Sequence, residues 1–150
     1  MSRGDVSLVV SVPMYETILV ATDGSERARK AAEYAVDLAA QYDATVHAIF
    51  VVDTHLLDEP ALSTAELSTD LIEDAGHGFL VEVERLAEER GVPFERRSVH
   101  GVPKFEILEY AADVSADLIV MGSIGHTPGH RVGSVADYVF EHADQPVMTL

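Results

Sequence analysis

Apolar positions follow two patterns that alternate along the chain. Short runs rich in β-branched residues are typical of buried strands, whereas apolar residues that return every three or four positions mark one face of a helix. Strands and helices therefore alternate along the chain, which begins and ends this series with a strand. This order predicts an α/β fold. The expected strands are Thr17–Ala21, Ala44–Val52, Phe94–Val99, Asp117–Met121 and Pro146–Leu150.

Four helices are predicted between these strands. The first ends at Asp43 and the second at Gly91. Asp53–Leu67 has no clear period and contains Pro60, so we expect a loop there, and His100–Pro103 has the composition of a turn. The apolar faces are expected to be Ala28, Ala31, Ala35, Leu38, Ala39 and Tyr42; Ile72, Ala75, Phe79, Val83, Leu86 and Ala87; Phe105, Leu108 and Ala112; and Val132, Val135, Ala136, Val139 and Phe140.

Continuous apolar strands separated by helices indicate a parallel sheet that is covered on both faces. Because such crossovers are right-handed, the sheet is expected to be doubly wound. We expect a single sheet of five strands in the order 3-2-1-4-5, with the polar third strand near an edge. Ligands of these sheets bind beyond the carboxyl ends of the strands. Asp23, after the first strand, and Gly122, after the fourth, are therefore predicted to lie on either side of one crevice.

The composition is that of a single folded domain. The chain has 150 residues, of which 47% are hydrophobic, and it contains no cysteine, which excludes disulfides and thiolate metal sites. No apolar run approaches the roughly 20 residues of a membrane span, and Val6–Val12 is short for a secretory signal. We expect a cytoplasmic protein with an N-terminal extension, residues 1–13, before a domain over residues 14–150.

The charge is strongly negative, with a formal net charge of -16. This surface repels phosphates, so nucleic acid is not an expected partner. The acidic residues are dispersed, and Lys30 and Lys104 are the only lysines. This composition is typical of a halophilic organism with a salt-loaded cytoplasm, where about 1 M salt shortens the Debye length to about 3 Å. An ordinary acidic protein is the alternative.

The stretch Gly122–Ser134 carries the chemistry of an anion site. Its glycines allow backbone N–H groups to approach a ligand, and Ser134 opens the fourth helix, where unpaired N–H groups favour phosphate. Ser123 adds a hydroxyl group and Arg131 adds a positive charge. The alternative is a flexible loop capped by Ser134. Neither the P-loop nor the GxGxxG pattern is present.

Several segments together resemble the universal stress protein (UspA-like) family, from about Tyr15 to Leu150. The glycines and serines of this stretch are similar to the family's G-x-x-G-x9-G-[S/T] motif for ATP. The likeness includes Ile18–Ser25 (ILVATDGS), Ala48–Asp53 (AIFVVD) and Ala116–Ser123 (ADLIVMGS). The resemblance implies an ATP site in which Asp23 lies at the adenosine and metal side, with Mg as the accompanying ion. Val51 would meet the adenine, Met121, Gly122 and Ser123 would line the nucleoside end, and Gly125, Gly133, Ser134 and Val135 would hold phosphates.

The motif departs from the family pattern in two ways. Seven residues, rather than nine, separate Gly125 from Gly133, and Ile124 stands where the family usually has a polar or basic residue. His126, His130 or Arg131 are candidates for the missing charge. The spacing of the two histidines would suit a metal site on a helix, but Pro128 and Gly129 between them favour a loop.

The function implied by the resemblance is that of a homodimeric stress-response regulator that binds ATP. The dimer would form through Pro146–Leu150, with Val147 and Thr149 near the axis, since a bare apolar edge is a hazard. One alternative is a family member that binds no nucleotide and acts through contacts with an unidentified protein. Another is a slow nucleotide hydrolase, which is disfavoured because no catalytic base or nucleophile pair is visible. A receiver-like or flavodoxin-like domain is disfavoured because the anion chemistry follows the fourth strand.

Overall fold

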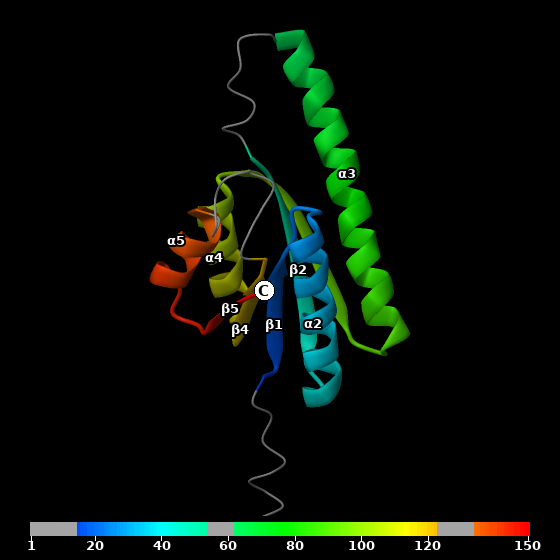
Figure 1. Cartoon of the computed structure of the whole chain (residues 1–150), viewed down its shortest axis with the longest axis vertical. Helices are drawn as coiled ribbons and strands as arrows, with labels where there is room; N and C mark the ends of the chain where they lie inside the picture. Colours follow the sequence, from blue (N-terminus) through cyan, green and yellow to red (C-terminus); the bar gives the residue numbers. More distant parts are fainter. Residues whose placement is uncertain (1–14, 54–61, 123–133) are drawn as a thin grey trace, which may run out of the picture.

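The computed structural model describes residues 15–53, 62–122 and 134–150, and within them strands and helices alternate as expected. Figure 1 shows their arrangement. The elements are β1 (Thr17–Ala21), α2 (Glu26–Tyr42), β2 (Thr45–Asp53), α3 (Leu62–Glu89), β3 (Phe94–Gly101), α4 (Pro103–Asp113), β4 (Leu118–Met121), α5 (Ser134–His142) and β5 (Val147–Thr149).

The five strands form one parallel sheet in the order β3-β2-β1-β4-β5, which confirms the predicted topology. The helices α2 and α3 cover one face, and α4 and α5 cover the other (Figure 1). The polar strand β3 lies at one edge, as predicted. Because β1 and β4 are neighbours, the segments that follow them leave the sheet at the same edge.

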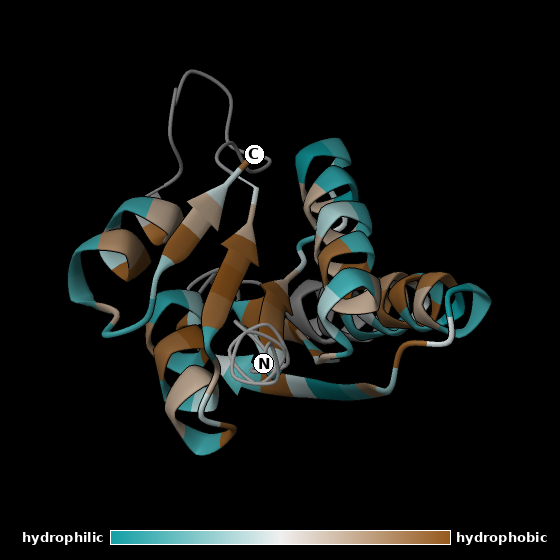
Figure 2. Ribbon diagram, turned by 90° about the horizontal axis from the view of Figure 1, so that it is seen from below, coloured by the Kyte–Doolittle hydropathy of each residue, from teal (hydrophilic) through white to brown (hydrophobic). Residues whose placement is uncertain are grey.

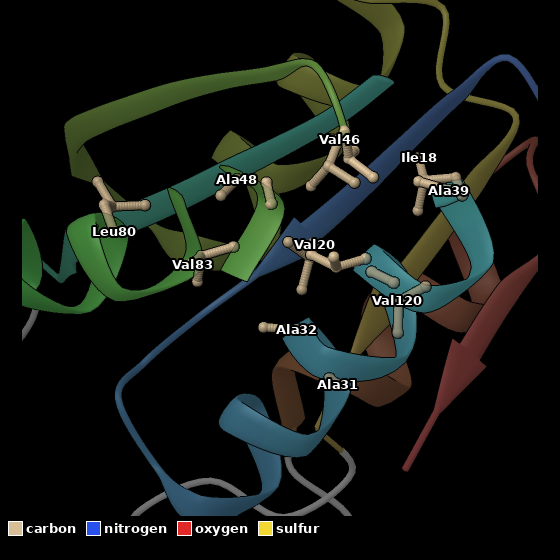
Figure 3. Close-up of a cluster of buried hydrophobic side chains, with 14 of the residues drawn as sticks. Ile18, Val20, Ala31, Ala32, Ala39, Val46, Ala48, Leu80, Val83 and Val120 are labelled. Atoms are coloured by element: carbon tan, nitrogen blue, oxygen red, sulfur yellow. The ribbon is translucent and has the colours of Figure 1, made fainter. Parts of the chain in front are cut away.

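Two cores form because successive side chains of a strand point to opposite faces. Ile18 and Val20 of β1 pack beneath α2 and α3, whereas Leu19 between them packs beneath α4 and α5, and all three are fully buried. Figure 3 shows Ala31, Ala32 and Ala39 of α2 over this strand, where small side chains let the helix approach closely. Figure 2 shows the central strands largely in the brown of apolar residues.

The ends of β1 and α2 are held by side chains that satisfy backbone groups. A carboxylate oxygen of Asp117 accepts hydrogen bonds from the backbone N–H groups of Glu16, at 2.8 Å, and Thr17, at 3.0 Å. The hydroxyl of Ser25 caps the start of α2 by accepting from Ala28 N, and Asp43 ends the helix in a left-handed conformation with φ 59°. Each device supplies a partner to a backbone group that the regular element leaves unpaired.

Two predicted boundaries were wrong. The loop expected over Asp53–Leu67 ends earlier, because α3 begins at Leu62, and Asp53 itself is the last residue of β2. The segment that follows Pro60 is made of residues compatible with a helix, and proline is common near a helix start. The turn expected at His100–Pro103 begins later, since His100 and Gly101 still pair with β2.

Three predicted helix faces were partly wrong. The core side of α4 consists of Ile107, Tyr110 and Ala111, whereas Phe105 is 50% exposed and Ala112 is also exposed. Both sets have helical spacing, so periodicity alone does not choose between them. Two further predicted core residues, Ala75 in α3 and Phe140 in α5, are exposed as well, the latter to 66%.

A polar pair lies between α4 and the sheet. The ring nitrogen Nδ1 of His47 in β2 lies 3.1 Å from the hydroxyl of Tyr110 in α4, and the guanidinium of Arg97 lies over the Tyr110 ring, 4.0 Å from its centre. Arg97 also donates to Asp113 at 3.1 Å. Desolvation lowers the pKa of His47; the nearby Glu95 raises it and Arg97 lowers it. Desolvation also raises the pKa of Tyr110.

The lowered pKa of His47 predicts a loss of stability in acid. The unfolded histidine takes up its proton near pH 6.5 while the folded one resists it, so the free energy of unfolding falls as the pH drops below that value. Urea unfolding between pH 7.5 and 5 measures this slope. We expect His47→Gln to be less acid-sensitive than the native chain, with His77→Gln, at an exposed position on α3, as the matched control. An unchanged slope in His47→Gln would contradict the prediction.

Candidate functional site

The turn after β1 is a compact structure that closes its own hydrogen bonds. The hydroxyl oxygen of Thr22 accepts from Gly24 N at 3.2 Å, and a carboxylate oxygen of Asp23 accepts from Ser25 N at 2.9 Å. Thr22 N donates to Ile49 O of β2 at 3.0 Å, which ties the turn to the sheet. Ser25 caps α2, so Asp23 shapes the turn rather than capping the helix.

The end of β4 lies against the start of α2. A Cβ atom placed on Gly122 would lie 2.9 Å from the Cβ atom of Arg27 and 3.0 Å from the backbone nitrogen of Ala28. Only a residue without a side chain fits this approach without a shift of the backbone. Gly122 and the β1 turn, residues 22–25, therefore meet at one edge of the sheet, as the strand order implied.

The other described candidates lie on the α4–α5 side of this edge. Met121 is buried there, and Val51 and Val135 are partly buried against the same core. Ser134 is the first residue of α5. Leu150, beyond β5, donates from its backbone N–H to Met121 O at 3.1 Å. The predicted positions Ser123, Gly125 and Gly133 lie outside the described residues, and so do Ile124, His126, Pro128, Gly129, His130 and Arg131.

Basic residues lie beside this edge, together with the acidic residues Asp23 and Glu26. Arg27, Arg29 and Lys30, in the first turns of α2, are three of the chain's 10 basic residues. Cations are unfavourable at the N-terminal end of a helix dipole, so the dipole of α2 does not explain their placement. Arg29 pairs with Glu82 of α3 at 3.2 Å. The edge therefore combines basic side chains with the start of a helix, which together attract anions.

Sequence reasoning missed the contribution of α3 to this edge. Phe79, predicted only as a core residue, lies against Gly24, and a small hollow beside them is lined by Thr22, Ser25, Arg29, Ala32, Phe79, Glu82, Val83 and Leu86. The available signal was the glycine in the Asp-Gly-Ser turn. A glycine there predicted an unusual backbone, but not which side chain covers it.

The described part of the chain contains neither a cluster of metal-ligating side chains nor a helix suited to crossing a membrane. Among residues 15–53, 62–122 and 134–150, no three histidine or acidic side chains group as metal ligands. In the same ranges no helix has the length and apolar character that a membrane crossing needs.

The fold described above is shared with known proteins. The model of the universal stress protein family matches residues 14–150, so the chain belongs to the universal stress protein family. A universal stress protein of Methanocaldococcus jannaschii is 40% identical over 140 residues, which cover 91% of this chain and 82% of that protein.

Solved structures agree with this assignment. The universal stress protein UspA from Lactobacillus plantarum matches with a TM-score of 0.75 and 31% identity, over 91% of this chain and 97% of that one. The crystal structure of a universal stress protein in complex with cAMP matches with a TM-score of 0.70 and 28% identity, over 91% and 97% of the two chains.

The close approach of Gly122 to α2 predicts a stability change. We expect Gly122→Ala to lower the free energy of unfolding by about 1–3 kcal/mol, because the new methyl group overpacks the contact with Arg27 and Ala28. The matched control is Gly78→Ala in α3, where no atom lies within 4 Å of the added Cβ. That substitution is expected to raise stability by about 0.5–1 kcal/mol. Denaturant unfolding measures both, and equal effects would contradict the prediction.

Proposed function

We propose that this protein is a stress-response regulator that binds an adenine nucleotide at the carboxyl edge of its sheet. The observation that carries the proposal is the meeting of the β1 turn, the end of β4 at Gly122 and the basic first turns of α2 at one edge. A related protein, 28% identical, has been crystallised with cAMP, which makes an adenine nucleotide the first ligand to test.

The proposed roles follow the family resemblance residue by residue. Asp23 would lie near the sugar and a Mg ion, and Val51 would meet the adenine through its backbone. Met121, Gly122 and Ser123 would line the nucleoside. Backbone N–H groups near Gly125, Gly133, Ser134 and Val135 would bind phosphates, because the start of a helix favours negative charge.

The length of the phosphate segment bears on which nucleotide binds. Two residues fewer between Gly125 and Gly133 shorten the reach of the chain by up to about 7 Å. That length is comparable to one or two phosphate groups, so a nucleotide with fewer phosphates than ATP is the second candidate for the same edge. The Cβ atom of Arg27 lies beside Gly122 at the same edge.

Direct binding measurements test this proposal. The protein is extracted with acid to detect a carried nucleotide, and ATP, ADP, AMP and cAMP are then titrated calorimetrically with and without Mg at high salt. We expect saturable binding of at least one of these nucleotides, weakened in Asp23→Ala and unchanged in Glu109→Ala, an exposed carboxylate on α4.

Two outcomes would favour a different function. If no nucleotide is extracted and none binds at millimolar concentration, the nucleotide proposal is wrong and contacts with a protein partner become the remaining function. Turnover of ATP that is lost in Asp23→Ala would instead support a slow nucleotide hydrolase.

We further propose a homodimer formed through Pro146–Leu150. β5 is the last strand in the order of the described sheet and pairs there with β4 alone. Phe140 and Tyr138 lie on opposite flanks of the buried Val139 in α5, and Tyr138 contacts Phe105 of α4. Phe140 is 66% exposed, and we propose that a second subunit covers it.

Sedimentation velocity tests the dimer. We expect Phe140→Glu to shift the protein from dimer to monomer, because a charge would be buried against the partner. The matched control is Leu71→Glu on α3, a residue that is 69% exposed on the other face of the sheet. A native chain that sediments as a monomer, or a Phe140→Glu variant that stays dimeric, would refute the proposed interface.

The acidic surface is proposed as an adaptation to concentrated salt. With a net charge of -16, repulsion between carboxylates opposes folding unless ions screen it. We expect the midpoint of thermal unfolding to rise between about 0.1 M and about 1 M KCl, where the Debye length falls from about 10 Å to about 3 Å. An unchanged midpoint would contradict the proposal and would favour the alternative, an acidic protein without adaptation to salt.

A further inference from the structure

Gly24 in the β1 turn is shaped to receive an aromatic ring from α3. Its φ of 81° lies in the left-handed region, which side chains rarely adopt. A Cβ atom added there would lie 2.0 Å from Cε2 and Cζ of Phe79. The ring of Phe79 therefore occupies the space that any side chain at position 24 would need, and it lies directly on the backbone of the turn.

A second glycine receives a second ring and holds α3 in place. A Cβ atom added to Gly76, one helical turn before Phe79, would lie 2.2 Å from the ring of Phe50 in β2. The rings of Phe50 and Phe79 meet edge to face, with centres 6.1 Å apart. The two phenylalanines and two glycines interlock, so α3 joins the body of the sheet to the β1 turn.

The hydrogen bond from Thr22 N to Ile49 O ties the first residue of the turn to β2, whereas the ring of Phe79 lies against Gly24 in the middle of the turn. The hydrogen bonds that Thr22 and Asp23 accept each span two residues and lie in a partly buried setting. Such bonds make only a modest net contribution to stability. The ion pair between Arg29 and Glu82 links α2 to α3 nearby, but both side chains are substantially exposed, which makes it a weak restraint.

We propose that Phe79 is a positioning residue for the ligand edge, acting through Gly24 on Asp23 and the start of α2. This inference rests on the proposed function, because it assigns Phe79 to the same edge. If so, the packing of α3 against the β1 turn and the binding of a ligand at the edge stabilise each other. By linkage, a ligand that needs the ordered turn also tightens the contact between α3 and the turn.

The test compares Phe79→Ala with Leu80→Ala in the full chain. Leu80, the next residue of α3, is 1% exposed in the core and serves as the matched control for a lost large side chain. The first readout is affinity for the nucleotide that the native chain binds. The second is amide hydrogen exchange at Gly24 and Ser25, which requires no ligand.

The two variants are expected to distinguish a loss of overall stability from a loss of order in the β1 turn. Phe79→Ala should weaken binding about tenfold or more and speed exchange at Gly24 and Ser25. Leu80→Ala should lower stability by a comparable or larger amount, yet leave affinity and these two amides close to those of the native chain. Native affinity and native exchange at Gly24 and Ser25 in folded Phe79→Ala would overturn the proposal.

A second variant keeps the test decisive if Phe79→Ala does not fold. Phe79→Tyr retains the ring, but the added hydroxyl extends from Cζ, one of the two atoms nearest to Gly24. It should therefore disturb the turn and weaken binding, and native behaviour would overturn the proposal. If the native chain binds no nucleotide while Phe79→Ala or Phe79→Tyr still loosens Gly24 and Ser25, the proposed ligand fails and the hold of Phe79 on the turn stands.

Discussion

The burial of β1 on both faces and along both edges is the constraint on which the rest of the molecule depends. Ile18, Leu19 and Val20 have no exposed surface, so each face of the sheet requires its own helical cover. The alanine-rich face of α2 is thin enough to lie close over β1 and β4. This close packing brings the start of α2 to the end of β4, and so it determines where the β1 turn and Gly122 meet.

Much of this arrangement could be predicted because it follows from local patterns. Short β-branched runs located β1 and β4, and the alternation with helices implied a parallel sheet covered on both faces. With the expected strand order, Asp23 and Gly122 fall at one edge of that sheet. Part of the core face of α4 was missed because Phe105, Leu108 and Ala112 have helical spacing, as Ile107, Tyr110 and Ala111 also do. Periodicity defines a stripe, but the neighbouring elements decide which stripe is covered.

The contact between Phe79 and Gly24 was beyond sequence reasoning for a different reason. It joins residues far apart in the chain, and each has an adequate local explanation, a core position for Phe79 and a turn for Gly24. What makes the pair specific is a ring placed against a left-handed backbone, which depends on how α3 crosses the sheet. The position of α3 depends in turn on the contact between Phe50 and Gly76. The contact between Phe79 and Gly24 therefore depends on a second tertiary contact.

The carboxylate of Asp117 bears on how the chain acquires its fold during synthesis. It holds the beginning of β1 from a position 101 residues later, and β4 follows directly after it. A nascent chain that has not yet reached this residue has β2 as the only described neighbour of β1, and one edge of its most apolar strand is bare. Completion of the central sheet therefore waits until β4 is available to insert beside β1.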